Sequence, residues 1–429
     1  MSTAALTVLL FVSLFGLMFI GLDLSFAIML CATVTITAGG LAPEILIAQR
    51  MVNSADSFTM IACPLFILSG FLMEESGMSR NLVNWASALF GKTKGGVGVV
   101  AIVTCMIFAA LTGSGPATVA AIGAIMFPAL VENGYPRDTA SGMLAAGGSL
   151  GPLIPPSIAM IIYGTTMGVS ISDMFAGALL PGVVMAGCLI AANFILSRKY
   201  DLKISEKQSK QEMLKLTWKA MGTLMMPIIV LGGIYSGIFT ATEAAGIAVA
   251  YSFAICLYYR KLTPRKLFRI LLQAAETNAI GLLILNSAAV FTWVLTDLQI
   301  PLKLTAWLVP NLGSATHFMI AMVGILLVAG LFMEPAVNIL IFAPLLVPVG
   351  LAFGIDLQYL SIVFCTTLII GFMTPPFGPN IFEAVAITKV PFVESSRGVL
   401  PFTAAACVAL LLVILIPGLS TWLPSLMGG

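Results

Sequence analysis

Apolar residues run along this chain in long blocks, where a soluble helix would carry them on one face only. A helix of about 20 residues, rising 1.5 Å per residue, crosses a hydrocarbon layer of about 30 Å. Alternating ten-residue strands are absent from the sequence, so the blocks predict helices and not a β-barrel. We predict membrane crossings near 4–20, 24–39, 57–73, 139–165, 174–197, 222–236, 238–259, 278–296, 357–385 and 399–420.

Two further apolar blocks, 95–131 and 315–351, are interrupted in their middles. The first interruption is Gly113-Ser114-Gly115-Pro116, and the second is Glu334-Pro335. Gly and Pro both favour breaks in a helix. We therefore predict two hairpins, each a helix–turn–helix that enters and leaves on the same side of the membrane. Two short crossings are the alternative, and the topology of the remaining chain is the same in both cases.

Three segments differ from this pattern. Residues 41–56 and 260–276 mix charges with an apolar face, which predicts interfacial helices, although ordinary amphipathic loop helices remain an alternative. The stretch 198–221 is the most polar of the chain and predicts a basic cytoplasmic linker. It divides the chain into a first half, 1–197, and a second half, 222–429.

Composition agrees with a membrane protein. Of the residues, 59% are apolar and 9% are charged, against about 25% charged in typical soluble domains. Such a composition argues against a water-soluble enzyme or a nucleic-acid-binding protein, and the net charge of +2 indicates no polyanionic partner. The seven cysteines lie in apolar stretches without a C-x-x-C pair, so neither a disulfide framework nor a zinc site is indicated.

The basic residues predict the orientation. If the N-terminus is outside, every Lys and Arg except Arg50 and Lys303 falls in a cytoplasmic loop. The positive-inside rule favours this arrangement strongly over its inverse. We therefore expect both termini on the periplasmic side, the first hairpin opening from the cytoplasm and the second from outside.

The two halves repeat each other. Five positions recur at an offset of 220: Pro128, Gly134, Gly151, Pro155 and Pro156 match Pro348, Gly354, Gly371, Pro375 and Pro376. Because the two hairpins are predicted to enter from opposite sides, the repeat is inverted. Inverted repeats with paired, interrupted helices are a common plan of secondary transporters, and the interruptions point to the binding site.

The double prolines predict unpaired backbone carbonyls at membrane depth. Proline lacks an N–H and its ring displaces the carbonyl four residues earlier. The carbonyls freed in this way are those of Gly151, Pro152, Gly371 and Phe372. A sodium ion is one partner for such carbonyls in transporters. The alternative is a proline kink in which Ser, Thr or water satisfies the carbonyls.

The hairpin tips predict an anion site. Pro116 and Pro335 suit the first position of a helix, so positive helix ends would begin there. Polar candidates for contacting an anion are Ser114 and Thr118 in the first half and Asn338 and Thr374 in the second. Alternatively, these side chains bond only to their own helices. Glu334 is an ionisable residue within a span, hence a functional candidate, unless it merely caps its helix.

Catalytic motifs are absent. His317 is the only histidine, so the sequence has no H-E-x-x-H, and it has no phosphate-binding G-x-x-x-x-G-K-[ST]. Transport would therefore depend on a gradient or on another subunit. A nucleophile–base pair for an intramembrane enzyme is not found either.

Four segments carry a family resemblance: GSGPATVAAIGAIMFPAL (113–130), GGSLGPLIPPS (147–157), LFMEPAVNILIFAPLLVP (331–348) and GFMTPPFGPNI (371–381). They resemble the large membrane subunit of TRAP transporters, the tripartite ATP-independent periplasmic systems, and the similarity extends over the whole chain. The resemblance implies an all-α polytopic fold of the elevator type, with a scaffold domain and a transport domain that holds both hairpins.

The resemblance also implies partners. A separate small membrane subunit of four helices and a periplasmic substrate-binding protein would work with this chain in the bacterial inner membrane. Transport would be coupled to Na⁺, with no organic cofactor, and the substrates would be organic acids such as C4-dicarboxylates or sialic acids. Nothing in the residues separates these two substrate classes.

Site residues follow from the resemblance by position. The predicted sodium ligands are Gly113, Ser114, Pro116, Gly151 and Pro152 in the first half, and Leu331, Met333, Gly371, Phe372 and Thr374 in the second. The predicted substrate-binding residues are Ser114, Thr118, Ser157, Glu334, Asn338 and Asn380. Many family members carry Asp where this chain has Glu334, which leaves the contact partner of this carboxylate open.

These observations lead to one hypothesis and its rivals. The hypothesis is sodium-coupled import of an organic anion by an elevator mechanism. A stand-alone sodium/proton or organic-anion exchanger, with Glu334 as the proton carrier, is the nearest alternative. An ion channel or a structural membrane scaffold belongs to a different class, and would show flux without saturation or no flux.

Overall fold

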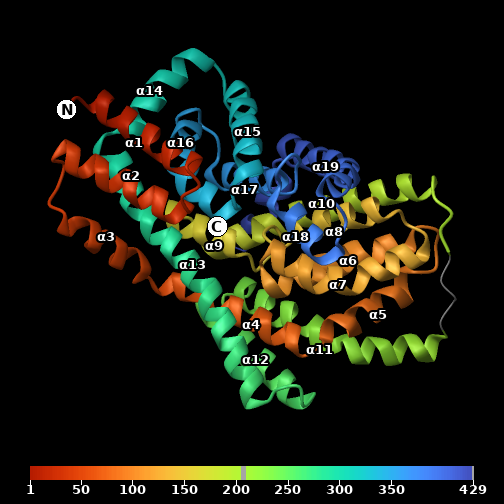
Figure 1. Ribbon diagram of the computed structural model, residues 1–429. Coiled ribbons are helices and arrows are strands. Elements are labelled where there is room, and N and C mark those ends of the chain that lie inside the picture. Colours follow the sequence, from red (N-terminus) through yellow and green to blue (C-terminus); the bar gives the residue numbers. More distant parts are fainter. Residues whose placement is uncertain (204–208, 428–429) are drawn as a thin grey trace.

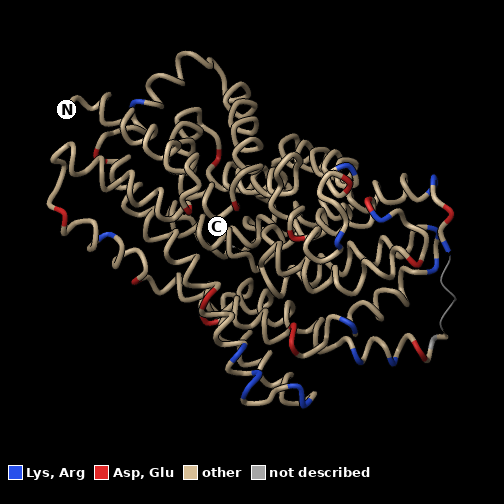
Figure 2. Tube along the Cα trace, in the orientation of Figure 1, with Lys and Arg blue, Asp and Glu red and all other residues tan. Residues whose placement is uncertain are grey.

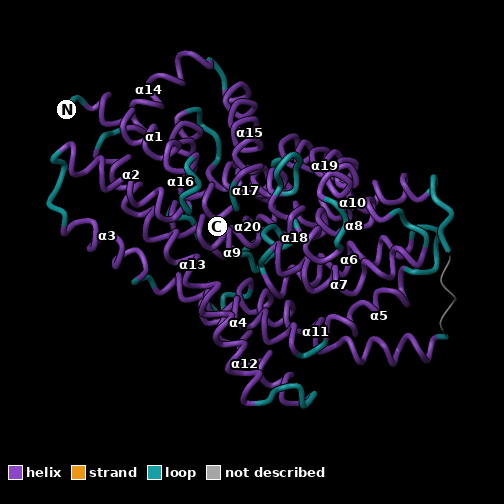
Figure 3. The backbone as a smooth tube through the Cα atoms, viewed as in Figure 1, coloured by secondary structure: helices purple, strands orange, loops and turns teal. Residues whose placement is uncertain are grey.

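The computed structural model describes residues 1–203 and 209–427, and all regular elements in these ranges are helices (Figure 1; Figure 3). Within the described ranges, nine helices are long and apolar enough to cross a bilayer, and shorter apolar helices accompany them. The predicted all-helical polytopic fold is confirmed. Residues 204–208 of the predicted linker lie outside the described residues.

The first repeat consists of α1 to α10. Its elements are α1 (Thr3–Phe19), α2 (Leu24–Gly39), α3 (Ile45–Ala55), η1 (Phe58–Ile61), α4 (Ala62–Glu75), α5 (Met78–Phe90), α6 (Gly96–Thr112), α7 (Gly115–Asn133), α8 (Arg137–Gly148), α9 (Ile158–Met167) and α10 (Ile171–Ser197). Helices α6 and α7 form the first predicted hairpin, and α8 and α9 are the two parts of the first broken helix.

The second repeat runs from α11 to α19, and α20 follows it. Its elements are α11 (Lys210–Tyr235), α12 (Ala241–Tyr258), α13 (Pro264–Asp297), α14 (Ile300–Leu312), α15 (Ala315–Phe332), α16 (Pro335–Ala352), α17 (Leu357–Phe372), α18 (Pro379–Thr388), α19 (Phe392–Leu415) and α20 (Gly418–Leu426). The second hairpin, α15–α16, and the second broken helix, α17–α18, are both at their predicted places.

The helices associate in two groups, each built from both repeats (Figure 1). The framework helices are α1 to α5 and α11 to α14; here α12 packs on α4, and α13 packs on α2 and α3. The hairpin domain is α6 to α10 with α15 to α20. In it the second arm of each hairpin contacts the broken helix of the other repeat, since α7 lies on α18 and α16 lies on α9. Helices α5 and α14 also pack on the hairpin domain, through α6 and α16.

Helix α13 differs from the prediction. We expected an interfacial helix at 260–276 and a separate crossing at 278–296, but one continuous helix covers 264–297. Between its first turn and its end no proline occurs and Gly281 is the only glycine, which a long helix tolerates. Its first turns are tied to α4, because Glu75 pairs with Lys266 at 2.5 Å and with Arg269 at 3.3 Å.

Two connecting helices were not predicted. Helix α5 mixes polar and apolar residues, so no crossing is visible in its sequence, yet it buries Leu82, Val83 and Ala86. Helix α14 has a proline in its first turn, a position where proline is tolerated, and a second one at Pro310. The two helices occupy corresponding places before the two hairpins.

Helix α11 also differs from the prediction. It begins twelve residues before the predicted crossing at 222–236, so the latter part of the predicted linker is helical.

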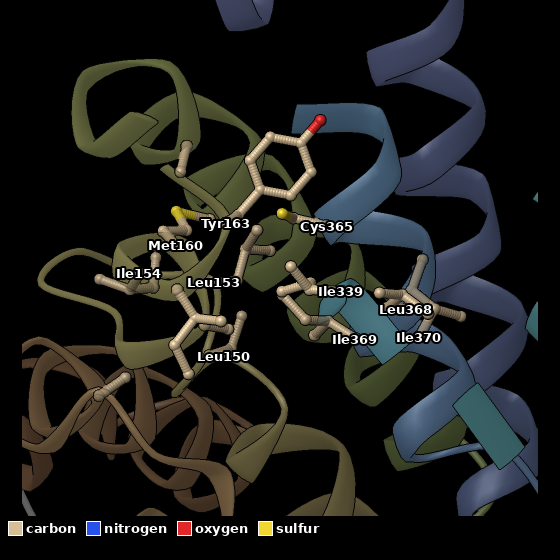
Figure 4. Packing of buried hydrophobic residues seen from close by; sticks show 14 of the residues in the cluster. Leu150, Leu153, Ile154, Met160, Tyr163, Ile339, Cys365, Leu368, Ile369 and Ile370 are labelled. Carbon is tan, nitrogen blue, oxygen red and sulfur yellow. The ribbon is translucent and has the colours of Figure 1, made fainter. Parts of the chain in front are cut away.

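Apolar side chains join the two halves of the hairpin domain (Figure 4). Leu150, Leu153 and Ile154 come from the first break, and their side chains are at most 4% exposed. In Figure 4 they face Ile339 of α16 and Cys365 of α17, which are also buried. The first break is therefore held in the core by contacts with the second repeat.

Basic residues are segregated in space (Figure 2). They gather around the ends of α5 and α10 and at the turn between α12 and α13, whereas the end with α1 and α2 has few. This distribution supports the predicted orientation, in which both termini face the periplasm; the orientation itself stays a prediction, since the structure contains no membrane.

We predict that Gly398→Ala destabilises the protein strongly. Helices α8 and α19 cross at Gly142 and Gly398, and an added Cβ on Gly398 would overlap the carbonyl group of Asp138, which is backbone and cannot rotate away. Overpacking typically costs about 1–3 kcal/mol, which should lower the melting temperature of the purified protein. Gly187→Ala, with no atom within 4 Å of the added Cβ, is the control. Equal melting temperatures for the two variants would contradict the prediction.

Candidate functional site

Both hairpin tips place a helix N-terminus inside the protein. Helix α7 begins at Gly115 with Ser114 as its N-cap, and α16 begins at Pro335 with Glu334 as its N-cap. The second tip is as predicted, whereas the first helix starts one residue earlier than expected, so that Pro116 occupies its second position. Neither N-cap side chain bonds to its helix. Proline contributes no N–H and the Val337 amide donates to the Glu334 carbonyl, so the amides of Gly115, Ala117 and Ala336 keep their donor capacity.

The first tip lies directly in the first break. An added Cβ on Gly151 would overlap the carbonyl of Ser114 and lie 2.7 Å from the nitrogen of Gly115. Gly113 has a positive φ of 62°, and its Cβ position is 2.7 Å from the carbonyl oxygen of Pro156. Glycine is thus required at both positions, because any side chain would push the tip out of the break.

The two tips and the two breaks meet around one small cavity of about 40 Å³. It is lined by Gly113, Ser114, Gly115, Pro152, Ile158, Ala159, Glu334, Pro335, Ala336 and Phe372. The four interruptions, which are far apart in the sequence, therefore bring five of the predicted site residues together here. These residues are Gly113, Ser114, Pro152, Glu334 and Phe372.

A larger cavity of about 300 Å³ adjoins the tips, between α4 and α13 of the framework helices and the hairpin domain. Ser114 and Glu334 line both cavities. Glu334 is exposed, and no Lys or Arg of the described chain lies within 4 Å of its carboxylate. The other polar side chains of this cavity are Glu74, Thr112 and Thr277, none of which was predicted.

Hydroxyl groups join the two sides of the first tip. The oxygens of Thr112 and Thr118 are 3.0 Å apart, and the Thr118 hydroxyl donates to the Ser114 carbonyl at 2.8 Å. Thr118 is completely buried, so its hydroxyl does not line the cavity and its role as a substrate-binding residue stays a prediction. Thr112 was missed by the sequence reasoning, although its place directly before the Gly113 break could have indicated it.

Two asparagines brace the second repeat. Asn338 donates to the Met333 carbonyl at 2.9 Å, which holds the second tip closed. Asn380 donates to the Ser149 hydroxyl at 3.0 Å, beside the first tip. Both side chains are fully buried, and the Oδ1 atom of each has no hydrogen-bond donor among the described residues. A buried amide oxygen without a donor is unfavourable, so each is a candidate ligand for a cation.

The predicted bare carbonyls are satisfied in two of four cases. The Ser157 hydroxyl donates to the Pro152 carbonyl at 2.5 Å, and the Thr374 amide donates to the Gly371 carbonyl at 2.9 Å. Ser157 is completely buried and also caps α9, so its position is explained by structure. For the carbonyls of Gly151 and Phe372, no donor occurs in the described chain.

The remaining predicted residues lie close to the second tip without entering the small cavity. Gly371 packs against Gly330 of α15, where its added Cβ would lie 2.7 Å from the Gly330 Cα. The Thr374 hydroxyl donates to the Ile370 carbonyl at 2.6 Å. Leu331 and Met333 are the final residues before the tip and are half-buried. Their assignment to a sodium site stays a prediction.

We predict that Ser157→Ala destabilises the protein more than Ser170→Ala. Both serines cap helices through the amide three residues on, but only Ser157 also satisfies a buried carbonyl. The loss of a cap costs about 1 kcal/mol, and an unsatisfied buried carbonyl adds about 1–3 kcal/mol. Melting temperatures of both variants in detergent test this prediction. An equal decrease in melting temperature for the two variants would show that the hydrogen bond to Pro152 contributes nothing to stability.

Comparison with known proteins places the chain in a family. Residues 11–419 match the family model for the DctM component of the tripartite ATP-independent periplasmic transporter. The C4-dicarboxylate TRAP transporter large permease protein DctM of Pseudomonas aeruginosa is 37% identical over 384 residues, 89% of this chain and 90% of that protein. The sialic acid TRAP transporter large permease protein SiaM of Vibrio cholerae is 31% identical over 96% of this chain and 97% of that protein.

A solved structure supports the fold. The YdaH transporter of Alcanivorax borkumensis aligns with a TM-score of 0.60, covering 88% of this chain and 90% of that one at 15% sequence identity, which is evidence for the fold alone. The sequence match over nearly the whole chain carries the assignment. The chain belongs to the DctM family, the large permease components of TRAP transporters.

Proposed function

We propose that this chain imports an organic anion across the bacterial inner membrane, coupled to sodium and by an elevator motion. The observation that supports it most directly is the small cavity where both tips and both breaks meet. Relatives are named for a C4-dicarboxylate and for sialic acid, and both carry carboxylates. The substrate class is therefore an organic acid, delivered by a periplasmic binding protein and transported with a separate small membrane subunit.

The residues around the cavity suit a sodium ion. Sodium is a hard cation that binds oxygen, and this region offers the carbonyls of Gly151 and Phe372, which have no donor in the described chain. The Oδ1 atoms of Asn338 and Asn380 are buried and equally without a donor. Carbonyls of interrupted helices coordinate sodium in other transporter folds.

Glu334 supplies a physical reason for coupling. An organic anion at the two helix N-termini would lie near a carboxylate that has no cation partner within 4 Å in the described chain. In a cavity of reduced dielectric constant the two negative charges repel each other strongly. A sodium ion between them removes this repulsion, so sodium and the anion each strengthen the binding of the other, as linkage requires.

Helix α13 supports the elevator motion. One stripe of this helix, from Thr277 to Ile284, lines the cavity at the tips. The same stripe continues from Leu285 to Thr296 along a second cavity of about 530 Å³, and Leu340 of α16 lines both. At 1.5 Å per residue, a shift of the hairpin domain by about 10–20 Å along α13 would carry the tips from one cavity to the other.

The proposal predicts sodium-dependent uptake. Proteoliposomes containing this chain, its small membrane subunit and the binding protein should accumulate labelled succinate or sialic acid when sodium is present outside. Replacing sodium by potassium at matched membrane potential should reduce uptake at least tenfold. Uptake that is unchanged in potassium would refute sodium coupling, and flux that does not saturate with substrate would favour a channel.

Glu334→Gln is predicted to weaken sodium dependence. Without the carboxylate, sodium loses the negative charge that attracts it to the cavity, so the sodium concentration at half-maximal uptake should rise at least tenfold. Glu334→Asp keeps the charge and should change it less than threefold. Both variants are measured by sodium titration of uptake in the same proteoliposomes. If Glu334→Gln instead abolishes proton-coupled exchange with sodium dependence intact, the exchanger alternative is favoured.

A further inference from the structure

A third cavity, of about 600 Å³, lies between the framework helices and the hairpin domain at the side predicted to be cytoplasmic. Three cationic side chains from three separate framework segments line it: Arg80 of α5, Lys219 of α11 and Lys261 after α12. The only acidic lining residue is Glu74. The cavity therefore has an excess of two positive charges, which suits an anionic ligand.

These cations are not neutralised by the protein. In the described chain the two ion pairs both belong to Glu75, with Lys266 and Arg269, so no carboxylate lies within 4 Å of the three cavity cations. The positive-inside rule explains why many cations occur at this level of the membrane. It does not explain why three segments that are far apart in the sequence each place a cationic side chain at the same cavity.

A second observation points to a ligand. Ser79 lines the same cavity, is 5% exposed, and its hydroxyl has no hydrogen-bond partner among the described residues. An unsatisfied buried hydroxyl is unfavourable, and native proteins usually avoid it. Asn81 adds an amide group to the lining. Cations together with hydroxyl and amide donors are the groups that bind phosphate oxygens.

The opposite wall is apolar. It is formed by Ala120, Ala121, Ala124 and Ile125, which lie on one face of α7 in the first hairpin. A charged rim facing a smooth apolar wall matches a molecule with a phosphate head and a hydrocarbon chain. Basic pockets between helices at the cytoplasmic side are known to bind the head groups of anionic lipids.

We propose that this cavity binds the phosphate group of an anionic phospholipid from the inner leaflet, with an acyl chain along α7. The phosphate would contact Arg80 and Lys219 of the framework helices and Lys261 of the connection between α12 and α13, while the acyl chain would contact the hairpin domain. A bound lipid thus bridges the two groups of helices and stabilises their present relative position. This inference does not depend on sodium coupling or on the identity of the transported anion.

The test is the thermal stability of the full-length chain in detergent, titrated with phosphatidylglycerol, phosphatidylcholine or glycerol phosphate. Phosphatidylglycerol should raise the melting temperature by several degrees in a saturable manner, and phosphatidylcholine should not. The triple variant Arg80→Gln, Lys219→Gln and Lys261→Gln should lose this response. Native mass spectrometry of the same samples should show retained phosphatidylglycerol only on the chain with intact cations.

The control is the triple variant Arg198→Gln, Lys94→Gln and Lys199→Gln. It removes one Arg and two Lys that are exposed at the same side of the protein but do not line the cavity. The control should respond to phosphatidylglycerol as the unmodified chain does. Equal loss in both triple variants, or an equal response to phosphatidylcholine, would overturn the proposal. A full response to glycerol phosphate would assign the cavity to soluble phosphate esters and overturn the proposal of a bound lipid.

If the cavity variant unfolds without lipid, the single variants Lys219→Gln and Lys261→Gln are titrated instead. Each should then bind phosphatidylglycerol at least threefold more weakly than the unmodified chain. Because no transport is measured in these experiments, their outcome is distinguishable from that of the uptake experiments.

Discussion

The structure depends on one constraint: backbone polar groups at membrane depth must be satisfied within the protein. A continuous helix meets this requirement by itself, whereas four interruptions in this chain do not. They are accommodated because they meet at one place, where Gly151 receives the first tip and Ser157 donates to the Pro152 carbonyl. The groups that stay without a protein partner, among them the Asn338 and Asn380 oxygens, surround the same place. The interruptions and the sodium site proposed above would therefore share one arrangement.

The two repeats are not chemically equivalent at this place. Ser114 and Thr118 in the first tip correspond, at the offset of 220, to Glu334 and Asn338 in the second. The first tip closes on itself through hydroxyl groups, and the second closes through an amide and presents a carboxylate. This asymmetry concentrates the negative charge on one side of the cavity. A cation at the second tip would therefore meet different atoms from a cation at the first tip.

The sequence allowed the positions of the interruptions to be predicted, because Gly and Pro act locally. Both hairpins, both broken helices and the start of α16 at Pro335 followed from residue type and spacing. The convergence of the interruptions did not follow, since it depends on tertiary contacts, both within a repeat, as between Ser114 and Gly151, and between the repeats, as between Gly115 and Asn380. The donors to the Pro152 and Gly371 carbonyls have a different cause. Ser157 and Thr374 lie only five and three residues further along the chain, so these bonds depend on the local path of the backbone, and they agree with the alternative in which Ser or Thr satisfies the carbonyls. Helix α13 was divided wrongly because a change in polarity was mistaken for a change in structure.

Packing inside the hairpin domain is closer than packing between this domain and the framework helices, and this difference bears on the proposed elevator motion. Inside the hairpin domain, glycines bring backbones into direct contact, as at Gly142 with Gly398 and at Gly330 with Gly371. Between the domain and the framework helices, the described chain has four cavities of about 300 to 630 Å³. Close-packed interiors resist deformation, and a loosely packed boundary costs less to rearrange. Displacing the hairpin domain as one body therefore preserves the contacts that satisfy its interrupted backbone. Bending it would instead separate the first tip from its break and expose those groups to hydrocarbon.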